Sequence, residues 1–167
     1  MDILALERLP LLDACINEAL RLYPVVPTGG IRQTTDRGIM IDGKWIPPYT
    51  VIVAPRWSIG RLASAFEKPD EFVPERWTTR PEMVKDARAF NAFGLGRHVC
   101  PGKKLGTLIV RLAAAMVLSN FELYRDPSNK EQAQVLGDMQ DCFTSQPGRL
   151  DIVFKPLAPS SKSYGNI

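Results

Sequence analysis

The sequence predicts an α+β fold in which helices predominate, and two kinds of pattern lead to that prediction. Residues 11–22 and 102–119 carry the apolar spacing of helices, whereas the segment between them alternates short apolar runs with turn signals. A third observation is a glycine-rich loop, residues 93–102 with the sequence FGLGRHVCPG, which offers one cysteine immediately before the second helix. With 167 residues and 45% hydrophobic content, the chain has the size of one domain.

Composition argues against several other classes of protein. The three cysteines, Cys15, Cys100 and Cys142, are too few and too far apart for a disulfide framework, and a single histidine gives no zinc-finger spacing. A net charge of +3 without a basic run gives no indication of nucleic-acid binding. No run reaches about 18 consecutive apolar residues, and the first ten residues lack the layout of a signal peptide. We therefore expect no nucleic-acid partner and no membrane segment in this chain.

The first helix is predicted by one apolar stripe, at positions 12, 15, 16, 19 and 22, and Pro24 ends it. The second helix is apolar nearly all round, which is typical of a helix buried in a larger body. Its first turn carries Lys103 and Lys104, where the positive end of the helix dipole disfavours cations. Local helix stability therefore does not explain these two lysines.

Turn chemistry predicts the short strands. The D-G dipeptide at 42–43 indicates a hairpin over residues 39–46, and the P-G dipeptide at 147–148 suggests a second hairpin over residues 142–154. Residues 69–81 hold three prolines among charged and aromatic residues. We expect that segment to be ordered but irregular, and packed on a surface of the protein.

The cysteine loop has the properties of a metal site. Gly94 and Gly96 permit backbone conformations closed to other residues, so the chain can turn tightly beneath a flat ligand. Pro101 suits the first position of a helix, which places Cys100 at a helix N-terminus, where neighbouring cations and the helix dipole favour a thiolate. Taken alone, such a cysteine is more often a buried apolar thiol. Within this loop it is a candidate iron ligand.

Three motifs in a fixed order carry a family resemblance. They are E-x-x-R at residues 18–21, P-E-R-W at residues 74–77 and the cysteine loop at residues 93–102. With them the chain resembles the C-terminal part of a cytochrome P450, a haem-thiolate monooxygenase, over about residues 9–156. The phrases E-A-L-R-L-Y-P and G-R-H-V-C-P-G most resemble filamentous-fungal members.

The resemblance implies haem, iron protoporphyrin IX, as cofactor and Cys100 as the axial ligand of its iron. The cofactor-binding residues that it implies are Arg32, Phe93, Gly96, His98, Cys100 and Gly102. The family usually has an arginine at the position of His98, donating to a haem propionate, and a neutral imidazole lacks that permanent charge. Arg32 aligns with another propionate-binding position, the alternative being a solvated surface charge.

Supporting residues also follow from the resemblance. In the family, the equivalents of Glu18, Arg21 and Arg76 form a buried charge network that holds the segment before the cysteine. Taken alone, Glu18 and Arg21 are typical of an ordinary surface pair. We expect the network to support the haem site without ligating or catalysing.

The activity implied by the resemblance is hydroxylation of a small hydrophobic organic substrate with dioxygen and two electrons, in fungal secondary-metabolite biosynthesis. The electron donor expected is a flavoprotein or a ferredoxin-type protein, docking at a basic face with Lys103, Lys104 and Arg111. A merely solvated basic edge is the alternative.

The family's oxygen-activating pattern, A-G-x-[DE]-T, does not occur in this sequence. We therefore expect residues 1–157 to form a partial domain that lacks the N-terminal half and the oxygen-activating helix, and residues 158–167 to form a disordered tail. One hypothesis is a truncated form of a monooxygenase. The other is a non-catalytic remnant, or a haem-binding or partner-binding module. Relatives are usually anchored in the endoplasmic-reticulum membrane, whereas this chain without an anchor has the character of a cytoplasmic protein.

Overall fold

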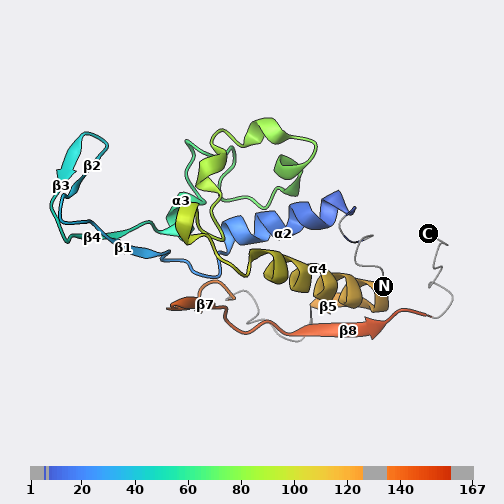
Figure 1. The fold of residues 1–167 in the computed structure, drawn as a ribbon. Coiled ribbons are helices and arrows are strands. Elements are labelled where there is room, and N and C mark those ends of the chain that lie inside the picture. Colours follow the sequence, from blue (N-terminus) through green and yellow to red (C-terminus); the bar gives the residue numbers. More distant parts are fainter. Residues whose placement is uncertain (1–5, 7, 126–134, 159–167) are drawn as a thin grey trace.

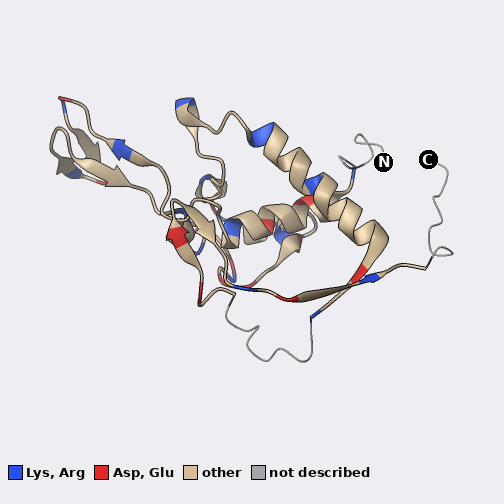
Figure 2. Cartoon of the chain, turned by 90° about the horizontal axis from the view of Figure 1, so that it is seen from below, with Lys and Arg blue, Asp and Glu red and all other residues tan. Residues whose placement is uncertain are grey.

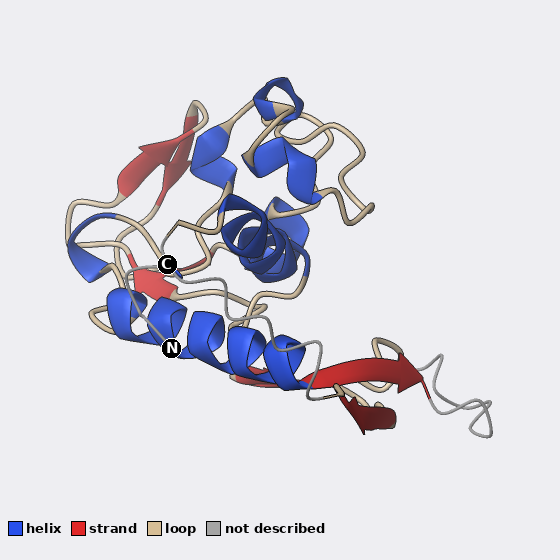
Figure 3. Cartoon of the chain, turned by 90° about the vertical axis from the view of Figure 1, so that its right-hand side faces the viewer, coloured by secondary structure: helices blue, strands red, loops and turns tan. Residues whose placement is uncertain are grey.

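The protein is described here by a computed structural model that covers residue 6 and residues 8–125 and 135–158. Two helices dominate it, α2 (Pro10–Leu22) and α4 (Lys103–Asn120), and they lie against each other with the irregular segment on the far side of α2 (Figure 1). Short strands occupy the periphery, as the view in Figure 3 also shows. These long helices and two-stranded sheets form the α+β architecture that the sequence predicts. The predicted tail, residues 158–167, lies outside the described residues except for its first residue.

Helix α2 follows its prediction closely. Pro10 stands in its first turn, where the fixed φ of proline suits a helix, and the helix ends where the N–H of Tyr23 donates to the carbonyl of Ala19 at 2.7 Å. Its buried residues are Ala14, Ile16, Glu18, Arg21 and Leu22. The apolar stripe therefore accounts for only part of the buried face, because a glutamate and an arginine share it.

Helix α4 begins slightly later than predicted. Gly102 is its N-cap and Lys103 its first residue, so Pro101 lies in the turn before the helix and not at the first helical position. The backbone needs that turn because the N–H of Lys103 donates to the carbonyl of Cys100 at 3.3 Å. Cys100 is consequently one turn away from the helix proper.

Most of the apolar surface of α4 faces solvent. Leu105, Ile109 and Met116 are 62%, 54% and 58% exposed, and no residue of α4 is buried in the part of the chain described. The helix is held to α2 on one side, where Arg111 forms an ion pair with Asp13 at 2.6 Å. The burial that its apolar sequence predicts is thus not reached within this chain.

The first two sheets contain the predicted hairpin. The strands are β1 (Ile31–Gln33), paired antiparallel with β4 (Val51–Val53), and β2 (Ile39–Ile41), paired antiparallel with β3 (Lys44–Ile46). Between β2 and β3, Asp42 and Gly43 have φ values of 48° and 71°. Two adjacent residues with positive φ are typical of a type I′ turn, so the D-G dipeptide acts as predicted.

The second predicted hairpin is wrong. The observed pairs are β5 (Phe121–Arg125) with β8 (Ile152–Pro156) and β6 (Gln140–Cys142) with β7 (Thr144–Gln146). The tight turn lies at Phe143, with φ 72°, and not at the P-G dipeptide. Strand β8 pairs instead with β5 over five matched positions, where the rings of Phe121 and Phe154 meet edge to face at 5.6 Å.

The segment between β4 and α4 consists of short helical turns. They are α3 (Arg56–Ile59) and the 3-10 helices η1 (Pro74–Trp77), η2 (Pro81–Met83), η3 (Ala87–Ala89) and η4 (Gly96–His98). Phe66 and Met83 are completely buried in this segment, which packs on α2 through η1. The predicted ordered, irregular packing of residues 69–81 agrees with this arrangement.

A charge network joins α2 to η1. Glu18, Arg21 and Arg76 are no more than 2% exposed. Arg21 donates to Glu18 through Nε at 2.9 Å and Nη2 at 2.8 Å, and Arg76 donates to the same carboxylate through Nε at 3.0 Å. The buried Glu-Arg-Arg network expected from the resemblance is therefore present.

The outer nitrogens of both arginines are satisfied by backbone. Arg21 donates to the carbonyls of Gly60, Pro69 and Glu71, and Arg76 to those of Glu67 and Lys68, at 2.5–3.2 Å. Among the described residues, no buried side-chain nitrogen or oxygen lacks a hydrogen-bond partner. The network therefore fixes the path of residues 60–76 as well as joining three side chains.

The pKa of Glu18 lies below its ordinary value. Burial alone would raise this pKa, but hydrogen bonds to the carboxylate from Arg21, the N–H of Val73, the indole of Trp77 and Arg76 outweigh it. The N–H of Val73 and the indole Nε1 of Trp77 donate at 2.8 and 2.9 Å. The native protein thus holds this carboxylate ionised.

Replacing Arg76 with leucine should lower the free energy of unfolding by about 3–5 kcal/mol, because it leaves a buried carboxylate without one of its partners. Urea unfolding measures this loss. Arg88→Leu is the matched control, because Arg88 is 88% exposed and pairs only with Asp86 next to it. Equal losses for the two variants would contradict a structural role for the network.

Acid should also weaken the protein through Glu18. Because its native pKa is depressed, the unfolded state takes up a proton first as the pH falls below about 4.3, the unperturbed glutamate value. The stabilisation from this ionised carboxylate is fully present above that pH and is lost as the pH falls through the native pKa. Urea midpoints measured between pH 7 and pH 3 test this expectation. A midpoint that stays constant over the acid range would contradict it.

Candidate haem-thiolate site

The cysteine loop is closed by a backbone hydrogen bond across its base. The N–H of Cys100 donates to the carbonyl of Phe93 at 2.8 Å, and η4 forms the turn between them. Gly94 and Gly96 have φ values of 78° and 65°, which favour glycine. The predicted need for glycine at both positions agrees with this geometry. The loop consequently folds back on itself and brings Phe93 and Cys100 together.

An open hollow lies in front of this loop. It contains about 790 Å³ of empty space, including solvent at its mouth. Phe93, His98 and Cys100 line it from the loop. Its other lining residues are mostly apolar. They are Leu20 from α2, Val25, Val26 and Gly30 from the segment after it, Arg56 from α3, Ala92 just before the loop and Phe143 from the β6–β7 turn. The structure thus combines a thiol and an imidazole in a largely apolar hollow.

The ligands available limit which metal group fits. Within the described ranges, no three histidine, cysteine or acidic side chains gather to hold a bare metal ion. Cys15 is half-buried on α2 and Cys142 is exposed on β6, and neither lines the hollow. A metal at Cys100 would therefore need most of its ligands from elsewhere. A metal held in a flat macrocycle meets that requirement and also suits apolar walls.

The other predicted residues take different places around the hollow. A Cβ at Gly102 would lie 3.6 Å from the sulfur of Cys100, an ordinary van der Waals contact, so Gly102 adjoins the thiol. A Cβ at Gly96 would meet nothing within 4 Å, which leaves backbone conformation as the reason for that glycine. His98 lines the hollow and is exposed.

Arg32 is not among the residues that line the hollow. It lies exposed on β1 and donates to the carbonyl of Ile31 at 2.8 Å. Its Nη1 is 3.1 Å from the position of a Cβ at Gly30, and Gly30 does line the hollow. Arg32 is therefore next to a residue that lines the hollow but does not line it itself.

Sequence reasoning missed Arg56. This residue begins α3 and lines the hollow together with His98 and Cys100. No motif spacing connects it with the cysteine loop, because it lies 44 positions before Cys100. Only the fold brings them together.

The basic edge near the loop is smaller than predicted. Lys103 and Lys104 are exposed in the first turn of α4, which is coloured blue in Figure 2. Arg111 is instead engaged with Asp13, through Nε at 2.6 Å and Nη2 at 2.8 Å. Arg111 therefore holds two helices together, and Lys103 and Lys104 remain as the cations that a docking protein could meet.

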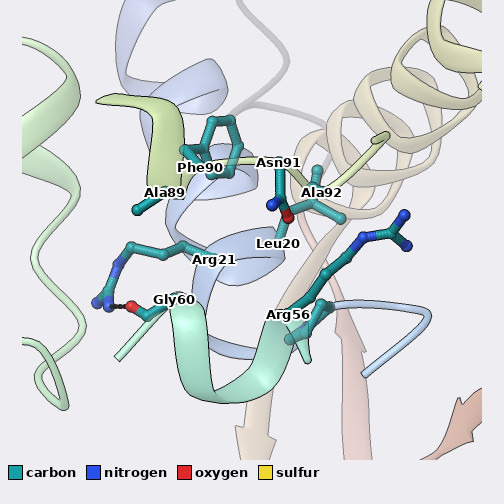
Figure 4. Close-up of a pocket in the computed structure, with 9 residues that line it drawn as sticks. Leu20, Arg21, Arg56, Gly60, Ala89, Phe90, Asn91 and Ala92 are labelled. Atoms are coloured by element: carbon teal, nitrogen blue, oxygen red, sulfur yellow. Dashed lines mark hydrogen bonds between the residues drawn. The ribbon is translucent and has the colours of Figure 1, made fainter. Parts of the chain in front are cut away.

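Aromatic packing connects the charge network with the cysteine loop. The indole of Trp77 donates to Glu18, and its ring lies 4.6 Å from that of Phe90, centroid to centroid. Phe90 precedes the loop, and residues 89–92 line a narrow pocket together with Leu20 and Arg21 (Figure 4). The base of the loop thus rests on residues that the network positions.

The sequence profile of the family Cytochrome P450 matches residues 1–151. The chain belongs to the cytochrome P450 family. Among its relatives, cytochrome P450 monooxygenase orf5 of Eupenicillium brefeldianum is 41% identical over 150 residues, which cover 90% of this chain and 30% of the relative. Cytochrome P450 monooxygenase nodW of Hypoxylon pulicicidum is 35% identical over 153 residues, covering 92% and 29%. Tryprostatin B 6-hydroxylase of Aspergillus fumigatus is 37% identical over 118 residues, covering 71% and 21%.

Solved structures show the same P450 fold. The heme domain of cytochrome P450DA matches with a TM-score of 0.81 at 22% identity, over 96% of this chain and 34% of that one. A cytochrome P450 named CYP102L1 matches with a TM-score of 0.77 at 24% identity, over 92% and 33%. The family resemblance and the fold predicted from the sequence are both confirmed. The chain spans about 30% of the length of the first of these relatives.

Cytochromes P450 are haem-binding enzymes, which confirms the predicted cofactor at the level of the family. Among the described residues, no helix has both the length and the hydropathy needed to cross a membrane.

Gly29 provides a test of how the hollow is built. A Cβ there would lie 2.1 Å from the carbonyl oxygen of Ala54, at a φ of 87°. Gly29→Ala should therefore lower the free energy of unfolding by about 2–4 kcal/mol, combining backbone strain with overlap. Gly43→Ala is the matched control, because its φ is 71° and its Cβ would meet nothing within 4 Å. Equal losses of unfolding free energy for Gly29→Ala and Gly43→Ala would show that close packing at Gly29 does not contribute to stability.

Proposed function

We propose that this chain forms the haem-thiolate wall of a fungal-type monooxygenase, with Cys100 as the axial ligand of the haem iron. The observation that carries the proposal is a single exposed thiol lining a largely apolar hollow. Membership of the cytochrome P450 family supports it, because the cysteine loop carries the family's motif. The reaction proposed is hydroxylation of a small hydrophobic organic substrate with dioxygen and two electrons.

The residues around the hollow suit haem. Phe93 supplies an aromatic surface for a flat ring, Gly96 adopts the positive φ of the loop's turn, and Gly102 adjoins the sulfur. The imidazole of His98 can donate one hydrogen bond to a haem carboxylate. Arg32 lies beside Gly30, which lines the hollow, and the hydrogen bond to the carbonyl of Ile31 engages only its Nη1. When bound, haem supplies dioxygen activation, which a thiolate ligand favours by pushing electron density onto the iron.

The chain itself contributes position and shape. The hydrogen bond from Cys100 to the carbonyl of Phe93 holds the thiol toward the hollow, and the network centred on Glu18 holds the loop's base. The apolar wall excludes water from one side of the bound cofactor.

The comparisons support the proposed reaction class. Relatives over most of this chain are named as fungal monooxygenases, and one is named as a hydroxylase of tryprostatin B. We extend to this chain only the class of oxidation and a role in secondary-metabolite biosynthesis. The substrate is proposed to be small and hydrophobic because the lining of the hollow is mostly apolar.

An electron donor is proposed to dock at the first turn of α4. Lys103 and Lys104 are exposed there, adjacent to the cysteine loop. Cations at that place would steer an acidic flavoprotein or ferredoxin-type donor. Their presence in the first turn, where the helix dipole disfavours them, is then explained by recognition.

A second candidate function is a non-catalytic haem-binding or partner-binding module. The exposed apolar side chains of α4, including Leu105 and Ile109, favour it because such surfaces are typical of interaction sites. This candidate retains the haem site but not the oxidation of a substrate.

Reconstitution of the chain with haem tests the proposal. After reduction under carbon monoxide, the unmodified chain should show the red-shifted Soret band of thiolate ligation, and Cys100→Ala should abolish it. Cys142→Ala is the matched control and should keep the band, because Cys142 does not line the hollow. The absence of the band from the unmodified chain would overturn haem-thiolate ligation. A band without oxidation of any substrate by a reduced donor would favour the second candidate.

A further inference from the structure

Arg56 is a half-buried cation without a partner. Within the described part of the chain, its guanidinium makes no hydrogen bond or ion pair, although it lines the hollow. Other arginines that point into the fold are engaged, as Arg21 and Arg76 are with Glu18 and Arg111 is with Asp13. The charge of Arg56 is therefore available to a group that enters the hollow.

Two glycines lie beside this side chain. A Cβ at Gly29 would lie 3.6 Å from Cγ of Arg56, and a Cβ at Gly94 would lie 3.5 Å from its Nη2. Both glycines have positive φ, at 87° and 78°. They come from separate segments, one before β1 and one in the cysteine loop. The stem and the head of Arg56 are thus accommodated by backbone on both sides.

Arg56 does not belong to the charge network. Figure 4 shows Arg21 directed toward the carbonyl of Gly60, whereas Arg56 extends away from it on the other side of the narrow pocket. The network is complete without Arg56, since Arg21 and Arg76 satisfy Glu18. A structural role in that network therefore does not account for this residue.

Among the described residues, no acidic side chain lines the hollow and could neutralise Arg56. The residues that line it are apolar apart from Arg56, His98 and Cys100. A guanidinium in largely apolar surroundings gains from an anion, and its planar fork matches a carboxylate with two parallel hydrogen bonds. The carboxylate must therefore come from the ligand.

We propose that Arg56 binds a carboxylate of the haem held in this hollow and supplies the permanent charge that His98 lacks. This inference rests on the function proposed above. Haem carries two carboxylates, the imidazole of His98 has no permanent charge, and Arg32 does not line the hollow. Arg56 thereby completes the set of groups that orient the cofactor above Cys100.

Haem and its dimethyl ester, whose carboxylates are uncharged, test the inference by titration into the full chain. Arg56→Gln should weaken haem binding about tenfold, the worth of one charge-assisted hydrogen bond, and leave binding of the ester nearly unchanged. Arg56→Lys keeps the positive charge but lacks the planar fork of the guanidinium. Its haem affinity should lie between that of the unmodified chain and that of Arg56→Gln. It also takes the place of Arg56→Gln if the latter shows no cooperative urea transition.

Arg88→Gln is the matched control, because it removes the same charge from an 88% exposed side chain outside the hollow. Arg88→Gln should change neither the affinity for haem nor the affinity for the ester. If the Arg56 variants lost equal affinity for haem and for the ester, Arg56 would act through packing and the inference would be overturned. Unchanged affinity for both ligands would overturn it as well. If the unmodified chain shows no Cys100-dependent band with carbon monoxide, the proposed function itself fails, and the inference falls with it.

Discussion

The carboxylate of Glu18 lies inside the protein between two arginines, and the rest of the structure depends on that contact. Burying three charged groups costs more free energy of desolvation than their mutual attraction recovers, unless the other N–H groups of the arginines also form hydrogen bonds. Here the outer nitrogens of Arg21 and Arg76 find carbonyls of the segment from Gly60 to Glu71. The network therefore contributes a specified path for an irregular segment, which has little regular hydrogen bonding of its own to fix it.

That specified path reaches the candidate site through aromatic contacts. Trp77 donates to Glu18 and packs its ring against Phe90, which leads into the cysteine loop. The position of Phe90, three residues before Phe93, is thus coupled through Trp77 to a buried carboxylate on α2. The loop then needs only its own glycines and the hydrogen bond from Cys100 to Phe93 to direct the thiol. A site made by a loop becomes rigid because its base is held by the core.

Local chemistry made part of this structure predictable from sequence. The D-G turn, α2 and the order of the three motifs need only near neighbours or a fixed signature, so residues 18–21, 39–46 and 93–102 were all interpretable. The pairing of β8 with β5 was not, because β5 lies about 30 residues earlier and the nearer P-G dipeptide suggested a hairpin. Arg56 was missed for the same reason. Its place beside His98 and Cys100 in the hollow comes from the fold, and no spacing in the sequence reveals it.

The openness of the hollow decides which forces can hold a cofactor there. A ligand that lies on one apolar wall buries only part of its surface, so burial contributes less than it would in an enclosed cavity. The apolar side chains of α4 are exposed as well, which shows how little of the apolar surface around this site is covered within the chain. Ligation by Cys100 and pairing with cations do not depend on complete enclosure in the same way. If the proposed assignments hold, directional contacts from the thiol, His98 and Arg56 would determine the cofactor's orientation more than shape does.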